Sequence, residues 1–222
     1  MRPNLLKPIL YLITRGATTE TTTPEAVEFQ EILTQVSAAV AAGISLIQLR
    51  EKNLTTRVLF ELTLRVAMIT RGSPTRVLVN DRADIAAGAV ADGVHLTTRS
   101  LGADVIRKSF GAQFLIGSST HSLAEARAAK EGGADFVVFG PIFDSSSKKE
   151  YGPPLGVDQL SGVVRELAPF PVLALGGISM TNAKECLDAG AAGLAGISLF
   201  REPERLKAIM NAAKEFVRGD LK

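Results

Sequence analysis

Short apolar runs alternate along the chain with longer segments that have helical periodicity. Eight such runs occur, each five or six residues long and rich in Val, Ile, Leu or Phe. Near-continuous apolar runs of this length are typical of parallel strands that are buried on both faces. The predicted strands are 9–14, 46–51, 76–81, 93–97, 114–119, 136–141, 172–177 and 193–198.

The segments between these runs carry helix start and stop signals. Thr23 is the expected N-cap of the first helix, with Pro24 at its first helical position and Gly43 at its end. Segments 123–135 (LAEARAAKEGGAD) and 181–193 (TNAKECLDAGAAG) follow the same pattern, with a polar start, an alanine-rich body and a glycine at the end. Each helical segment is followed by another predicted strand.

Eight β/α units in sequence predict an α/β fold, a closed (β/α)8 TIM barrel, with residues 1–222 in a single domain. The alternative is an open, doubly wound parallel sheet. That fold normally has a glycine-rich turn after its first strand, and the segment 13–20 (ITRGATTE) lacks the pattern. The barrel is therefore the preferred prediction.

Composition narrows the class of protein. The 222 residues are 46% hydrophobic and 22% charged, with a net charge of +2 and no Trp, which gives no support for nucleic-acid binding. The single cysteine, Cys186, excludes an internal disulfide and is expected to pack within a helix. No apolar stretch reaches the ~18 residues of a membrane span and no signal peptide is visible, so a cytoplasmic protein is expected.

Polar and small residues gather where the predicted strands end. Chemistry in a TIM barrel is located at the C-terminal ends of its strands, so this distribution agrees with the predicted fold. The residues at these ends are Gln48 to Lys52, Asn80 to Arg82, His95, Ser119 to His121, Gly140, Pro141, Gly176, Gly177 and Ser198.

Two of these regions are candidate anion sites. Gly176 and Gly177, after the seventh strand, let backbone N–H groups approach a phosphate, although they also suit a tight turn without a ligand. In the loop after the sixth strand, Ser145, Ser147 and Lys148 offer hydroxyls and a cation to a pyrophosphate. The alternative for that loop is an ordinary solvated polar segment.

The motif QLREK (48–52) alternates with period two. Gln48, Arg50 and Lys52 should point one way, and Leu49 and Glu51 the other. An arginine that faces the barrel interior is costly unless it meets an anion. Arg50 therefore indicates a ligand contact, with a structural ion pair to a neighbouring acid such as Asp81 as the alternative.

Two further strand ends carry titratable side chains. Asp81 could hold Mg²⁺ beside phosphate oxygens, or it could cap the following helix together with Asn80. His95 and His121 are the only histidines, and each could be an acid, a base or a core residue with satisfied hydrogen bonds.

The chain resembles the thiamine phosphate synthase family, which includes a thiazole tautomerase branch. The resemblance covers nearly the whole chain. The Ser/Lys loop and seven further motifs carry it: QLREK, NDRADIA, DGVHL, IGSSTHSLAEA, ADFVVFGPIF, ALGGI and AGISLF. It implies a TIM barrel that joins an aminopyrimidine methyl pyrophosphate to a thiazole phosphate and releases pyrophosphate.

The resemblance also implies roles for individual residues. Arg50 and Lys148 would stabilise the leaving pyrophosphate, and Asp81 would be a ligand of Mg²⁺. His121 stands where the tautomerase branch has its proton-transferring histidine. The residues implied to bind the two substrates are Gln48, Arg50, Lys52, Asn80, Ser119, Ser145, Ser147, Lys148, Gly177, Ile197 and Ser198.

One position departs from the synthase pattern. Ser100 stands where the family usually has a second Mg²⁺-binding aspartate, and a hydroxyl is a much weaker ligand for this ion. Two alternatives therefore stay open: a metal-independent thiazole phosphate tautomerase, and a non-catalytic binder of thiamine precursors. The partners expected are small molecules, with no nucleic acid and no membrane, and the oligomeric state is left open, a homo-oligomer included.

Overall fold

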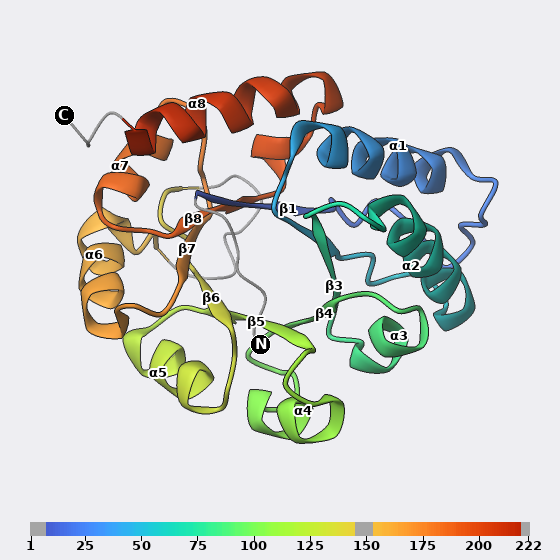
Figure 1. Ribbon diagram of the computed structural model, residues 1–222, viewed down its shortest axis with the longest axis horizontal. Coiled ribbons are helices and arrows are strands. Elements are labelled where there is room, and N and C mark those ends of the chain that lie inside the picture. Colours follow the sequence, from blue (N-terminus) through green and yellow to red (C-terminus); the bar gives the residue numbers. More distant parts are fainter. Residues whose placement is uncertain (1–7, 145–152, 219–222) are drawn as a thin grey trace.

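The computed structural model describes residues 8–144 and 153–218, and a closed barrel of eight parallel strands forms its centre (Figure 1). Neighbouring strands follow the chain order, and β8 pairs with β1. This confirms the predicted TIM barrel. The strands are β1 Ile9–Ile13, β2 Leu46–Leu49, β3 Arg76–Asn80, β4 Gly93–Leu96, β5 Leu115–Thr120, β6 Phe136–Phe139, β7 Val172–Leu175 and β8 Gly193–Gly196.

Helices surround the barrel on its outside (Figure 1). They are α1 Val27–Ala42, α2 Thr56–Thr70, α3 Ala83–Gly88, α4 Ala103–Phe110, α5 Leu123–Glu131, α6 Gly156–Leu167, α7 Ala183–Asp188 and α8 Leu206–Arg218, with the 3-10 turns η2 Ser198–Phe200 and η3 Pro203–Arg205. None of the helices in the described part of the chain is long and apolar enough to span a membrane.

The predicted start of the first helix is wrong. Thr23 does not cap α1: its carbonyl accepts a hydrogen bond from the Ala26 N–H (3.0 Å) in a separate turn, and the helix begins at Val27. The hydroxyl of Thr22 instead donates to the Glu28 carboxylate (2.6 Å), which ties the preceding loop to the first turn. The predicted end is confirmed, since Gly43 has the left-handed φ of 78°.

Side chains alternate between two apolar layers. The residues that fill the barrel interior are Ile9, Tyr11, Ile13, Leu46, Leu78, Leu115, Phe136, Val138, Leu173, Ala192 and Ala195. Tyr11 and Phe136 meet edge to face at 5.5 Å, and a Cβ on Gly117 would lie 2.4 Å from the Phe136 ring. The intervening residues pack under the helices together with Cys186. Burial raises the pKa of the Cys186 thiol to about 12, so this cysteine is an inert packing residue, as predicted.

One hydrogen-bonding device recurs at the N-terminal rim of the barrel. The residue just before β2, β4 and β6 is Ser45, Asp92 and Asp135 respectively. Each accepts a hydrogen bond through its side chain from the second backbone N–H of the preceding strand, at 3.3, 2.8 and 2.8 Å. These contacts fix the register of three strand pairs at the end of the barrel that carries no candidate chemistry.

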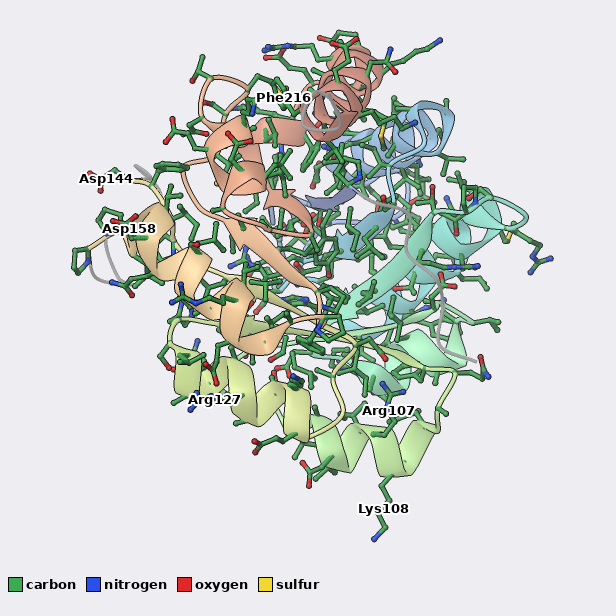
Figure 2. The ribbon with its side chains drawn as sticks, turned by 60° about the vertical axis from the view of Figure 1, so that its left-hand side comes forward. Arg107, Lys108, Arg127, Asp144, Asp158 and Phe216 are labelled. Atoms are coloured by element: carbon green, nitrogen blue, oxygen red, sulfur yellow. The ribbon has the colours of Figure 1, made fainter. Side chains whose placement is uncertain are left out.

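Asp135 is the most elaborate case, because it also receives Arg107 of α4. Its Oδ2 atom accepts from Arg107 Nη2 (2.7 Å), and the carboxylate is only 7% exposed. Arg107 donates further to the carbonyls of Gly133, Gly111 and Phe114. Figure 2 shows Arg107 on the side of α4 that faces the barrel, whereas Lys108 points away from the molecule.

We expect Asp135→Asn to lower the free energy of unfolding by about 3 kcal/mol, because it removes one partner of a buried ion pair. Asp92→Asn is the matched control. Asp92 makes the same backbone contact but pairs with Arg76 at 3.2 Å and is 28% exposed, so it should cost clearly less. Urea unfolding of both variants measures the difference, and equal losses would contradict the importance of burial.

Candidate active site

The interior of the C-terminal rim is divided into a polar half and an apolar half. The inward-facing side chains near the ends of β2 to β5 are Gln48, Asn80, His95 and Ser119. Those near the ends of β6, β7, β8 and β1 are Val138, Leu175, Ile197 and Ile13. A ligand in the mouth of the barrel therefore meets hydrogen-bonding groups on one side and an aliphatic wall on the other.

The polar half is held in place by two side-chain pairs. Gln48 Nε2 donates to Asn80 Oδ1 (3.0 Å), and His95 Nε2 lies 2.9 Å from Ser119 Oγ. Gln48 and His95 are both 2% exposed. Buried polar pairs of this kind fix the rotamers of their members, so the hydrogen-bonding capacity left on Asn80 and Ser119 has a defined direction.

Three cations lie together above this layer. The pKa of Lys52 is lowered from 10.5 by burial and by the charges of Arg50 and Arg99, whereas Asp81 acts to raise it. Within the described residues, none of the three cations forms an ion pair. Lys52 thus lies within range of the charges of Arg50, Arg99 and Asp81, and an anion bound beside it would offset the repulsion from the two arginines.

Two of the alternatives that the sequence left open are not seen in the described part of the chain. Arg50 makes no ion pair with Asp81, and neither Asn80 nor Asp81 caps α3, whose N-cap is Arg82 without a side-chain bond. Asp81 has a left-handed φ of 58°, and its N–H donates to the His95 carbonyl at 2.9 Å. This backbone is unusual for a residue other than glycine, and such conformations cluster at functional sites.

The residues beside Asp81 give little support for a metal held by protein alone. Ser100 Oγ accepts from the Thr97 N–H (2.8 Å) and lies 3.1 Å from Thr97 Oγ1, so this hydroxyl serves a turn after β4. The described residues contain no group of three or more His, Cys, Asp or Glu side chains suited to a metal. Asp81 fits Mg²⁺ only as one carboxylate that complements phosphate oxygens and water.

The glycines after β7 are required by packing. Gly176 and Gly177 have φ of 97° and 63°, and a Cβ on Gly177 would lie 2.4 Å from the Asp144 carbonyl oxygen. The chain after β6 therefore lies directly against this turn, and the two glycines are required there whether or not a phosphate binds. Ser145, Ser147 and Lys148 lie outside the described residues.

The other predicted residues lie around the same rim. Ile197 and Ser198 follow β8, and Ser198 begins η2. His121 lies between the ends of β5 and β6, where its Nδ1–H donates to the Gly140 carbonyl. In the neutral ring Nε2 is then the basic nitrogen.

Sequence reasoning missed the part played by the loop after β1. Gly16 and Thr18 of this loop are bonded to the Glu51 carboxylate, which the sequence placed on the outward side and gave no role. The sequence did contain one sign of a structural role for Glu51, because this acid lies between Leu49 and Leu54, which are apolar and pack under the helices. A cavity of about 550 Å³ lies beyond this loop and reaches Ile197 at the barrel mouth.

The fold and the C-terminal rim together define a class of protein: a TIM barrel with cations gathered at the end of the barrel where such proteins bind their ligands. A family model described as thiamine monophosphate synthase matches residues 10–200. The chain belongs to the thiamine monophosphate synthase family.

Individual relatives are similar to this chain over most of their length. The thiamine-phosphate synthase of Anaeromyxobacter dehalogenans is 42% identical over 82% of this chain and 82% of its own. That of Chlorobium phaeobacteroides is 38% identical over 82% and 87%. The solved structure of thiamine phosphate pyrophosphorylase from Pyrococcus furiosus superposes with a TM-score of 0.77 at 30% identity, covering 95% of this chain and 97% of that one.

We expect the affinity for inorganic pyrophosphate to fall at alkaline pH, starting below the ordinary lysine pKa of 10.5. The lowered pKa of Lys52 means that its charge is present at neutral pH and is lost as the pH rises through that value. Lys52→Arg keeps its charge and should hold affinity to higher pH. Calorimetric titration of both proteins cancels the titration of the ligand itself, and identical pH profiles would contradict a contact with Lys52.

Proposed function

We propose that this chain, as one domain over residues 1–222, is a thiamine phosphate synthase. It would join an aminopyrimidine methyl pyrophosphate to a thiazole phosphate, giving thiamine phosphate and pyrophosphate. The bond from the pyrimidine methylene carbon to the pyrophosphate oxygen breaks, and both electrons leave with pyrophosphate. The lone pair of the thiazole nitrogen then forms the new carbon–nitrogen bond.

The observation that carries this proposal is the cation cluster of Arg50, Lys52 and Arg99. Among the described residues these charges lack ion-pair partners, and the pKa of Lys52 is lowered first by burial and then by the charges of Arg50 and Arg99. A leaving pyrophosphate develops negative charge as its bond breaks. Fixed cations that already surround that position stabilise the charge without having to reorganise.

The divided rim suits the two organic substrates. The aminopyrimidine carries ring nitrogens and an amino group, which match Gln48, Asn80 and Ser119 on the polar half. The thiazole is largely apolar and matches the aliphatic wall, with Ile197 beside it. Holding the thiazole nitrogen next to the methylene carbon would supply much of the rate enhancement, because the coupling itself needs little proton transfer.

The phosphate of the thiazole is assigned to the turns after β7 and β8. Gly177 and Ser198 would bind it through backbone N–H groups and the hydroxyl, on the apolar side of the mouth. Ser145, Ser147 and Lys148 are assigned to the pyrophosphate by the family resemblance alone.

Mg²⁺ is assigned to Asp81, with pyrophosphate oxygens and water as its other ligands. When bound there, the ion would neutralise charge on the pyrophosphate. The charge of Asp81 acts to raise the pKa of Lys52 and so offsets part of the effect of the arginines. Asp81 directly follows β3 and has a left-handed backbone conformation.

Incubation with both precursors should yield thiamine phosphate and pyrophosphate, measured by chromatography and a phosphate assay. His121→Ala should retain most of this activity, because the coupling needs no proton shuttle. The tautomerase alternative makes the opposite prediction: no coupling by the unmodified protein, and a loss of thiazole isomerisation of roughly 10²–10⁴-fold in the variant.

We expect Ser100→Asp to lower the Mg²⁺ concentration that half-saturates coupling. The added carboxylate would increase the attraction for a divalent ion near Asp81, and it can still accept the Thr97 N–H. Coupling rates across a Mg²⁺ titration compare the two proteins, with Ser100→Asn as the neutral control. An unchanged midpoint in Ser100→Asp would show that this position does not face the ion.

A further inference from the structure

Glu51 is a buried carboxylate with three hydrogen-bond donors. It is 3% exposed, although both of its neighbours in the chain are cations. Its Oε1 atom accepts from the Gly16 N–H (3.0 Å), and its Oε2 atom accepts from the Thr18 N–H (3.3 Å) and the Thr18 hydroxyl (2.7 Å). Within the described part of the chain, Glu51 forms no ion pair, so its charge is compensated by these donors.

The loop that Glu51 holds, residues 14 to 18, lies against Arg50. The Arg50 N–H donates to the hydroxyl of Thr14 (2.8 Å), which is 1% exposed. Gly16 has a left-handed φ of 72°, and a Cβ there would lie 3.1 Å from the Arg50 carbonyl oxygen and 3.6 Å from Arg50 Nη1. Thr14 and Gly16 therefore lie against the backbone of Arg50, and Gly16 also lies close to one end of its guanidinium.

A further hydrogen bond attaches the same loop to the segment after β2. Asn53 Nδ2 donates to the Thr18 carbonyl at 3.3 Å. Gly16 and Thr18 are therefore attached to the segment that follows β2 at two positions just after Arg50, namely Glu51 and Asn53. A carboxylate suits this position better than an amide, because both of its oxygens accept and three donors converge on them.

From this geometry we propose that Glu51 is a positioning residue for the pyrophosphate site, acting through Arg50. It holds the loop after β1 against the end of β2, and that loop sets the direction of the Arg50 guanidinium. The proposal rests on the proposed function in one respect, since it takes the anion at Arg50 to be pyrophosphate.

The test is a double-mutant cycle of Glu51→Gln and Arg50→Ala, read by calorimetric titration with inorganic pyrophosphate at constant Mg²⁺. Glu51→Gln turns one acceptor into a donor and should weaken binding by roughly ten- to hundredfold, the value of a charge-assisted hydrogen bond. In the Arg50→Ala background the same change should cost no more than about twofold, the scatter of independent sites. Additive losses would overturn the proposal, because Glu51 would then act without Arg50.

Two controls separate positioning from loss of stability. Asp135→Asn removes a comparably buried carboxylate at the opposite rim and should lower stability while leaving pyrophosphate affinity unchanged. Thr18→Val removes a single donor at constant shape and should give a smaller loss of affinity in the same direction, even if Glu51→Gln folds poorly. An unchanged affinity in Thr18→Val and Glu51→Gln would reject the positioning role.

The ligands also distinguish the possible failures. Thiazole phosphate affinity should be the same in Glu51→Gln and the unmodified protein, and an equal loss for both ligands would mean general damage to the rim. If the unmodified protein couples both precursors but the cycle is additive, only the role of Glu51 is wrong. If it neither couples them nor binds pyrophosphate, the proposed function and the role of Glu51 are both wrong.

Discussion

The structure depends on the backbone pairing of its first and last strands. An open parallel sheet leaves two edges with unpaired N–H and C=O groups, and here the pairing of Ile9 to Leu12 with Gly193 to Gly196 removes both edges. Because a helix on the outside connects each strand to the next, all eight strands run in the same direction around one axis. Every strand therefore ends at one rim, so side chains far apart in the sequence, such as Gln48 and Asn80, become neighbours.

The two rims solve different electrostatic problems. At the N-terminal rim, Asp92 and Asp135 are paired with Arg76 and Arg107 and also hold backbone N–H groups, so charge is used to fix strand register. At the C-terminal rim the cations lack such partners in the described residues, and burial together with the charges of Arg50 and Arg99 lowers the pKa of Lys52. The barrel can carry cations without ion-pair partners at its C-terminal rim because contacts at its N-terminal rim fix the register of the strands. The stability of the barrel and the reactivity of its mouth are thereby separated in space.

The fold was predictable because a parallel barrel imposes a strong pattern, in which every strand is apolar on both faces. The eight strands were found in the right places. The main error is the start of α1, where Thr23 forms a separate turn with Ala26 and the helix begins only after it. Polar strand ends were also predictable, because period-two alternation assigns each side chain to a face. The role of Glu51 was not, because it depends on where a loop 33 to 35 residues earlier returns in space.

The alternation at the end of β2 resolves a conflict between binding and folding. An anion site needs cations without acids beside them, yet the loop that supports those cations needs a strong acceptor to hold it. Gln48 lies on β2, and Arg50, Glu51 and Lys52 follow directly after it, so one short segment supplies both the cations and the acid. If Glu51 faced inward, it would pair with Arg50 and neutralise the charge that attracts the ligand. Because it faces outward and is saturated by three donors, its charge fixes the loop without cancelling the site.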